Sequence, residues 1–246
     1  MFPSWRKGDL TVKVLFSIPA IATQVVISAE SVGFDLLLDC GCSALRDLLL
    51  DYYRDSKEFD RLKAILISHE HFDHVGGLYS LMDYMHVYGR VEPLTILTPK
   101  PSLVARHFIE TLMEFRGGKL AYSIKLVEVE DQEELQLGPL RVKAFKVLHR
   151  GSTKTEPIGP PIPAMGYTIN YKGLRVVYSG DTGICNNLME EVRGADLAIL
   201  EATWTEGKGI PGIHLSVDEA AKLGETAKDY ILIHRGSLRK QLLKGG

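Results

Sequence analysis

The sequence predicts a layered α/β protein, and three observations support this class. Short apolar runs that are typical of strands recur along the whole chain. Segments with helical spacing of apolar residues lie between these runs in both halves of the sequence. Hydrophobic residues make up 45% of the 246 residues and charged residues 24%, with a mean hydropathy of +0.00, as in chains that bury a core. The length favours a single domain over residues 1–246.

The predicted elements follow one another in an alternating order. Strands are expected at residues 12–16, 22–28, 34–39, 64–68, 94–98, 123–129, 142–148, 165–171, 174–178, 197–200 and 230–233. Helices are expected at residues 43–53, 74–88, 102–115, 186–192 and 216–226. Ser102 follows a proline at one helix start, and Ser216 with Glu219 forms a capping box at another.

The N-terminal apolar stretch, residues 14–22, has two interpretations. Arg6 and Lys7 precede it and it ends in Ala-Ile-Ala, which resembles a short signal peptide. Lys13 and Pro19 interrupt that pattern, and the preceding residues partly alternate as in a strand. A strand is therefore favoured. No apolar run reaches the 18 or so residues of a membrane-spanning helix, so no membrane protein is expected.

Charge and cysteine content limit the partners and the compartment. Lys and Arg number 29 and Asp and Glu 31, for a net charge of −2, so the chain has no global basic field for a polyanion. Cys40, Cys42 and Cys185 are an odd number without Cys-x-x-Cys spacing, which argues against a disulfide framework. We expect a cytoplasmic protein.

The most informative motif is His-x-His-x-Asp-His, formed by His69, His71, Asp73 and His74 directly after an apolar run. Imidazole and carboxylate are the ligands that zinc and similar metals prefer. In an extended stretch His69 and His71 share one side, whereas Asp73 and His74 lie beyond it. The spacing therefore permits two neighbouring metal sites.

Three further candidate ligands each follow an apolar run. His149 follows residues 144–148, Asp181 follows residues 176–180, and His234 follows residues 230–233. With His69, they predict four strand ends that converge on one rim of a sheet. The four-proline segment 151–164 comes after His149 and is expected to be a surface loop, with a lid over the site as the second interpretation.

This ordered set resembles the metallo-β-lactamase superfamily over about residues 10–236. The resemblance implies a four-layered αβ/βα sandwich with two divalent metal ions at one edge of the sheets, zinc in the first place and manganese or iron as alternatives. It implies the first ion at His69, His71 and His149, and the second at Asp73, His74 and His234. By the same resemblance Asp181 bridges the ions, and Asp39 orients ligands.

Other residues of these types are assigned structural roles. His86 and His107 stand outside the ordered set and are expected in helices. Cys40 and Cys42 are expected to pack, because single-residue spacing is uncommon for zinc. Gly76 and Gly77 could belong to a phosphate-binding loop, but no Walker-type Lys-Ser/Thr follows them. Close helix packing is therefore the favoured role of this glycine pair.

A two-metal site supplies a hydroxide at neutral pH, so the shared chemistry of the superfamily is hydrolysis. The segments Leu-Glu-Ala-Thr-Trp at 200–204 and Gly-Ile-His-Leu-Ser at 212–216 resemble those of the ribonuclease Z and phosphodiesterase branch. That resemblance implies catalytic roles for Asp73, Glu201 and His214, with His214 stabilising or protonating the leaving oxygen and Glu201 holding the tautomer of His214 and raising its basicity. Leu215 stands where the branch usually has Ser.

Ribonuclease Z activity itself is not expected to be strong. The long arm of that enzyme has no counterpart between His149 and Asp181, because the loop 151–164 is too short and its basic residues are Lys154 and the adjacent Arg150. Affinity for tRNA would depend on scattered groups, namely Arg235, Arg239 and Lys240. A small, cyclic-nucleotide-like or short nucleic-acid phosphodiester is therefore the expected substrate, and a homodimer the expected assembly.

Two other functions remain open. A lactone, thioester or other carboxylic-ester hydrolase of the same superfamily would carry the same metal ligands, and only Glu201 and His214 discriminate against it. A non-catalytic metal-binding scaffold would require a lost ligand, and none is missing from the ordered set. β-Lactam hydrolysis is the least favoured reaction.

Overall fold

The computed structural model describes residues 2–151, 158–205 and 212–237. The chain divides into two compact units, Met1–Val129 and Glu130–Gly246. Each unit contains one sheet with its own helices. The single domain expected over residues 1–246 stays a prediction.

The first unit is built on a seven-stranded sheet in which strand order follows chain order. Its strands are β1 (Ser4–Lys7), β2 (Leu10–Ile18), β3 (Ala22–Ala29), β4 (Phe34–Leu38), β5 (Leu62–Leu66), β6 (Leu94–Pro99) and β7 (Ile124–Val129). Strands β1 to β4 pair antiparallel, and β4 to β7 pair parallel. The carboxyl ends of β4 and β5 therefore lie side by side, which places residues 39 and 67–69 at one edge of this sheet.

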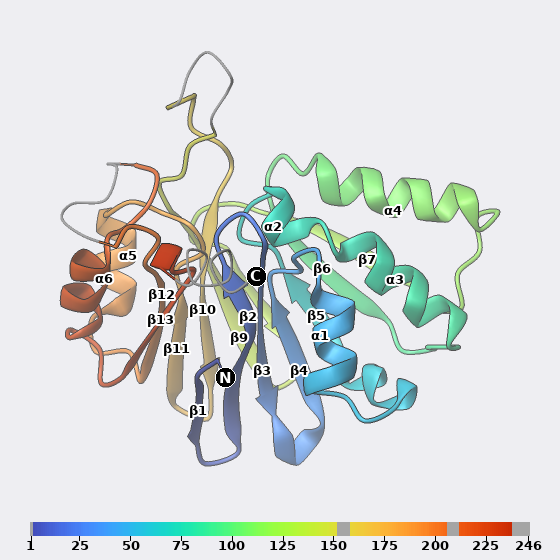
Figure 1. Cartoon of the computed structure of the whole chain (residues 1–246). Helices are drawn as coiled ribbons and strands as arrows, with labels where there is room; N and C mark the ends of the chain where they lie inside the picture. Colours follow the sequence, from blue (N-terminus) through green and yellow to red (C-terminus); the bar gives the residue numbers. More distant parts are fainter. Residues whose placement is uncertain (1, 152–157, 206–211, 238–246) are drawn as a thin grey trace. The chain divides into compact units, whose positions relative to one another are not determined.

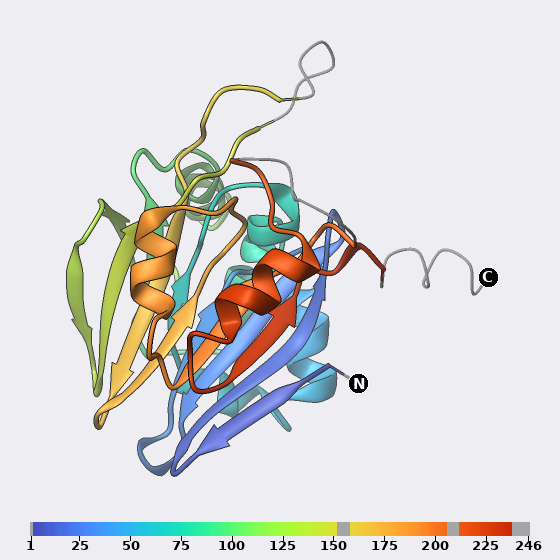
Figure 2. The same ribbon diagram turned by 90° about the vertical axis from the view of Figure 1, so that its left-hand side faces the viewer.

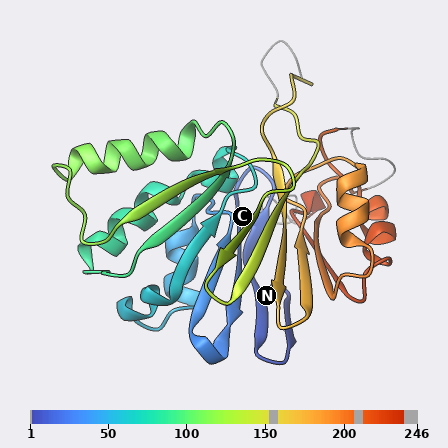
Figure 3. The same cartoon turned by 180° about the vertical axis from the view of Figure 1, so that it is seen from behind.

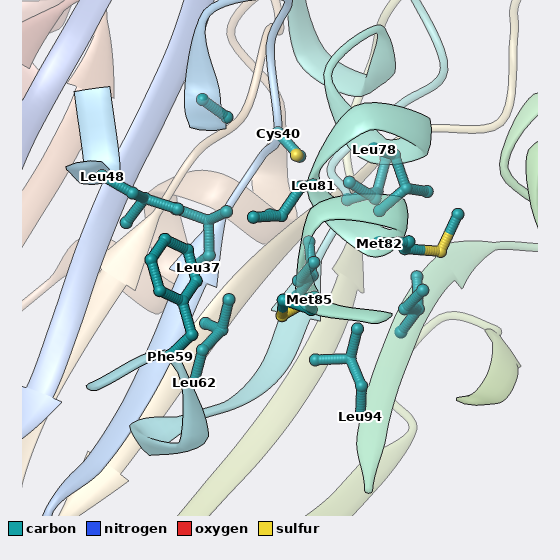
Figure 4. Packing of buried hydrophobic residues seen from close by; sticks show 14 of the residues in the cluster. Leu37, Cys40, Leu48, Phe59, Leu62, Leu78, Leu81, Met82, Met85 and Leu94 are labelled. Carbon is teal, nitrogen blue, oxygen red and sulfur yellow. The ribbon is translucent and has the colours of Figure 1, made fainter. Parts of the chain in front are cut away.

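The helices of the first unit are α1 (Ala44–Asp51), α2 (Phe72–Val75), α3 (Leu78–Val87) and α4 (Val104–Phe115), with short 3₁₀ turns at Glu30–Val32 and Ser56–Arg61. Helices α1 and α3 lie on one face of the sheet, and α4 runs beside α3 (Figure 1). Leu37, Leu48, Phe59, Leu62 and Leu81 pack in the core between these helices and the sheet (Figure 4). Burial of each such side chain contributes about 1.5–3 kcal/mol, so the strands that lead into the edge are firmly held.

The second unit has a six-stranded sheet with the order β13-β12-β11-β10-β9-β8. Its strands are β8 (Glu134–Leu137), β9 (Leu140–Lys146), β10 (Met165–Tyr171), β11 (Leu174–Tyr178), β12 (Leu197–Glu201) and β13 (Tyr230–Ile233). The pairing makes β9, β11, β12 and β13 run in one direction, because β10 is antiparallel to both its neighbours. Their four carboxyl ends therefore share one edge.

Helices α5 (Asn186–Val192) and α6 (Val217–Gly224) lie side by side on one face of this second sheet (Figure 2). They cover a second apolar cluster that includes Phe145, Leu188, Val192, Leu200 and Leu215. The hairpin of β8 and β9 lies at the margin of the sheet that is opposite β13. Figure 3 shows this hairpin from behind.

Most predicted elements are present within a few residues of their expected bounds. The favoured strand at the N-terminus is β2, whereas the short strands β1 and β8 were not predicted, because each has few apolar residues. No helix in the described ranges is long and apolar enough to cross a membrane. Residues 152–157 of the predicted lid at 151–164 lie outside the described residues, so the lid stays a prediction.

The helix predicted over residues 74–88 is two helices, and this is a correction. Helix α2 ends at Val75 and α3 begins at Leu78, with Gly76 and Gly77 between them. A Cβ on Gly77 would lie 2.1 Å from the carbonyl oxygen of Gly41. Only glycine permits this close approach of two backbones, so the pair serves close packing, as the sequence indicated.

Candidate metal centre

The first unit gathers the histidine motif beyond the end of β5, and we call Asp39, His69, His71, Asp73 and His74 the first half-site. His71 lies at the N-terminus of α2, and Asp73 and His74 lie in its only turn. His69 Nε2 is 3.0 Å from His71 Nδ1, and the rings of His69 and His74 have centroids 4.2 Å apart. The predicted proximity of His69 and His71 is thus present in the structure.

Asp39 orients this half-site from the end of β4. Its Oδ1 accepts a hydrogen bond from the Ser68 amide at 2.6 Å, and its Oδ2 accepts one from the Ser68 hydroxyl at 2.8 Å. The same Oδ2 lies 2.7 Å from His74 Nδ1. Because a carboxylate only accepts, a neutral His74 carries its proton on Nδ1 and its lone pair on Nε2. Asp39 has a left-handed backbone, φ 57°, a strained conformation that clusters at functional sites.

Glu70 lies between two candidate ligands in sequence, but its carboxylate caps a distant helix. It accepts hydrogen bonds from the Ser102 hydroxyl at 2.9 Å and from the amides of Leu103, Val104 and Ala105 at 2.8, 2.8 and 3.0 Å. These amides belong to the first turn of α4, where backbone donors have no partner within the helix. Sequence reasoning missed this role, and no local pattern signals it.

In the second unit the remaining candidates follow strands that share one edge of the sheet, and we call His149, Asp181, Glu201, His214 and His234 the second half-site. They follow or end β9, β11, β12 and β13, except His214, which precedes α6. The prediction of four convergent ends in one sheet needs a correction, because β5 belongs to the other sheet. Buried apolar strands occur in both sheets, so the sequence pattern could not assign them.

Three members of the second half-site form a compact cluster. Asp181, His214 and His234 each place a ligand atom within 4.8 Å of the others. His234 Nδ1 lies 3.4 Å from Asp181 Oδ1, and the rings of His149 and His214 have centroids 5.1 Å apart. His149 Nδ1 lies 2.8 Å from the carbonyl oxygen of Ile213, so it carries the proton and leaves the lone pair on Nε2.

Glu201 is the hydrogen-bonding centre of this half-site and has an exposed fraction of 0%. Its Oε1 accepts from the amides of Thr182 and Leu215, both at 3.1 Å, and lies 2.9 Å from His214 Nδ1. The pairing of Glu201 with His214 that the sequence suggested is therefore present. It also ties the turn after Asp181 to the segment that carries His214.

Thr203 also belongs to this network, although its place in the sequence predicted no role for it. Its hydroxyl oxygen lies 2.8 Å from Glu201 Oε2, 2.8 Å from His234 Nδ1 and 3.3 Å from His214 Nδ1. The residue stands next to the end of β12 in the Glu-Ala-Thr segment, and that position is the one signal that could have found it.

The donor atoms of both half-sites fit divalent cations. His74 and His149 present Nε2 because protein acceptors hold their Nδ1 protons, which is the arrangement typical of metal-binding histidines. Two imidazoles on a tetrahedral zinc ion, with bonds of about 2.0–2.1 Å, place their nitrogens about 3.3 Å apart, close to the His69 and His71 separation. Buried carboxylates at Asp73 and Asp181 complete the oxygen and nitrogen set.

Residues that were assigned structural roles lie outside this chemistry. Burial, and to a smaller extent the charge of Asp39, raises the pKa of the Cys40 thiol well above its usual value, so a thiolate ligand is disfavoured. Cys40, Cys42 and Cys185 are all free. His86 Nδ1 accepts from the Ala121 amide at 2.9 Å, which explains it as a structural residue of α3.

The family relationship agrees with the fold and the two half-sites. Residues 35–234, which include every candidate ligand, match the family model described as the β-lactamase superfamily domain. The chain therefore belongs to the metallo-β-lactamase superfamily of hydrolases.

Known proteins share sequence or fold with this chain. Ribonuclease Z of Ignicoccus hospitalis is 29% identical over 253 residues, which covers 87% of this chain and 82% of the relative. The short form of human tRNase Z has the same fold, with a TM-score of 0.73, 24% identity and coverage of 91% of this chain and 92% of the other. Zn²⁺-bound PqqB of Methylobacterium extorquens matches with a TM-score of 0.71, 16% identity and coverage of 91% and 88%.

Proposed function

We propose that the protein is a binuclear metal-dependent phosphodiesterase of the ribonuclease Z type. In this proposal His69, His71 and His149 hold one cation, Asp73, His74 and His234 hold the other, and Asp181 contributes to both. When bound, two such cations activate a water molecule and neutralise charge that develops on the scissile group. Zinc is the proposed metal, since the half-sites offer imidazole and carboxylate donors and the PqqB structure of the same fold is Zn²⁺-bound.

The observation that carries the choice of phosphodiesters is the pair of Glu201 and His214. Glu201 is fully buried, whereas the His214 side chain is 18% exposed, so His214 is the member that can reach a substrate. Its Nδ1 faces the carboxylate, which stabilises the protonated ring and leaves Nε2–H to donate. His214 is thus suited to protonate a departing oxygen, with Glu201 as its orienting partner. Asp73, whose Oδ2 is fixed by the Ala20 amide at 2.7 Å, is the third proposed catalytic residue.

The substrate we propose is a short or single-stranded nucleic acid, or a cyclic-nucleotide-like diester. The Ignicoccus relative aligns over 253 residues, more than the 246 residues of this chain, so that relative carries residues with no counterpart here. The net charge of −2 adds no general attraction for tRNA. We therefore expect weak processing of precursor tRNA 3′ trailers. The proposed assembly is a homodimer, and the proposed compartment is the cytoplasm.

A matched panel of substrates tests this function. Zinc-reconstituted enzyme is expected to hydrolyse bis(4-nitrophenyl) phosphate faster than nitrocefin, a homoserine lactone or a thioester. Asp181→Asn, which keeps the side-chain shape but removes a ligand charge, controls for contaminating hydrolases. Lactone or thioester turnover a hundredfold above diester turnover would replace the proposal with the carboxylic-ester alternative. Metal analysis should give about two equivalents per chain, and less than one would exclude the binuclear site.

A further inference from the structure

The hydroxyl of Thr203 stands between a carboxylate and two histidines of the second half-site. Its oxygen is 2.8 Å from both Glu201 Oε2 and His234 Nδ1 and 3.3 Å from His214 Nδ1. A hydroxyl has one proton to donate and two lone pairs that accept. The directions of these hydrogen bonds therefore depend on which neighbour can accept.

Glu201 determines those directions because both its oxygens act as acceptors. Oε2 accepts from the Thr203 amide at 2.9 Å, and Oε1 accepts from the Thr182 and Leu215 amides. The Thr203 hydroxyl thus donates its proton to Glu201 and offers a lone pair to His234. Consequently His234 carries its proton on Nδ1 and its lone pair on Nε2.

The backbone around His234 also depends on Thr203. His234 has a left-handed conformation, φ 51°, which is unfavourable for a residue with a side chain and needs support from its surroundings. The Gly236 amide donates to the Thr203 carbonyl oxygen at 3.2 Å, and a Cβ on Gly236 would lie 2.5 Å from that oxygen. Residue 203 therefore holds the turn after β13 through its main chain as well as its side chain.

We propose that Thr203 is a positioning residue that fixes the ring and the tautomer of His234 for metal binding, and that links His234 to the Glu201 carboxylate that orients His214. This inference rests on the proposed function, because it takes His234 as a metal ligand. The Glu201 carboxylate then orients both histidines. It contacts His214 directly and acts on His234 through the Thr203 hydroxyl. Loss of a hydrogen bond behind a metal-binding histidine typically weakens metal affinity 10–100-fold.

The test compares Thr203→Val, which keeps the shape and removes the hydroxyl, with Thr203→Ser, which keeps the hydroxyl. Thr168→Val is the matched control, because Thr168 is another threonine of the second unit whose hydroxyl donates to a carboxylate, that of Glu191, at 2.7 Å. Zinc affinity of the full chain is measured by competition with a chelator. We expect Thr203→Val to bind one of the two zinc ions about 10–100-fold more weakly than wild type. The zinc affinities of Thr203→Ser and Thr168→Val should stay within a few-fold of wild type.

Long-range ¹H–¹⁵N spectra of the imidazoles supply a second readout that needs no substrate. A proton on His234 Nδ1 in the wild type supports the inference even where Thr203→Val fails to fold, and a proton on Nε2 overturns it. Unchanged zinc affinity in a folded Thr203→Val variant overturns it as well. Should the affinity shift occur in a protein that hydrolyses no phosphodiester, the positioning role stands and the proposed function fails.

Discussion

Helices α4 and α6 both begin beside candidate site residues, but they are capped in different ways. At α6, Ser216 Oγ accepts from the Glu219 amide at 3.1 Å, and the Glu219 carboxylate accepts from the Ser216 amide at 3.0 Å. At α4 no side chain of the N-cap residue provides a cap, and Glu70 binds the first-turn amides from far upstream. One helix start is encoded within four residues, and the other depends on the tertiary structure.

Glu201 of the second half-site and Glu70 within the histidine motif show the same contrast. Glu201 is fully buried and joins three segments around His214, so its loss removes the partner of several buried donors. Glu70 is partly exposed and serves the end of one helix. A carboxylate within a site motif can therefore orient a site histidine or cap a helix, and its hydrogen-bond partners distinguish the two.

The largest effect is expected at His214, directly before α6. His214→Ala should slow hydrolysis of an alkyl or nucleoside diester by about 10² to 10⁴ and of a nitrophenyl diester much less, because a good leaving group needs no proton. Initial rates on the two substrates, with metal content checked, measure this bias. Equal losses would mean that His214 only positions the phosphate.

The loss of Glu201 should lower the free energy of unfolding more than the loss of Glu70. Glu201→Ala leaves buried amides and His214 without their acceptor and should lower the free energy of unfolding by about 3–5 kcal/mol. Glu70→Ala should cost about 1–2 kcal/mol, because the hydrogen bonds between Glu70 and the α4 amides are exposed or only partly buried. Urea denaturation of both variants measures which of them loses more stability. Equal losses would refute the distinction between Glu201 and Glu70.

Glu70 should act locally on α4. In Glu70→Ala the amides of the first α4 turn should exchange faster with solvent, since they lose their acceptor, while α6 keeps its protection. Hydrogen exchange read by mass spectrometry resolves the two helices. Glu58→Gln is the matched control, because Glu58 accepts a hydrogen bond from the Arg54 amide at 2.6 Å and lies outside the histidine motif. Exchange of the first α4 turn that is unchanged between Glu70→Ala and wild type would contradict the capping role.

The smallest effect is expected from the local cap. Ser216→Ala should destabilise the protein by about 1 kcal/mol through loss of the capping box, and Ser216→Thr should restore most of it. Thermal unfolding of the two variants measures the difference. A cost as large as that of Glu201→Ala would show that Ser216 supports more than the helix end.

Much of the candidate site could be predicted from the sequence. His69, His71, Asp73 and His74 lie within one short motif, so their proximity follows from local chain geometry. The remaining candidates each follow an apolar strand, and parallel strands bring their carboxyl ends to a shared edge. The capping box of α6 was predicted for the same reason, since all its atoms lie within one turn.

Tertiary structure alone decided the roles of Glu70 and Thr203. Glu70 finds its donors 32 to 35 residues further along the chain, and Thr203 reaches His234 across 31 residues. A hydrogen bond between such distant residues forms only after the strands and helices have packed, so no local spacing encodes it. The sequence by itself determined which residue types could bind metal, and packing determined which side chains would orient them.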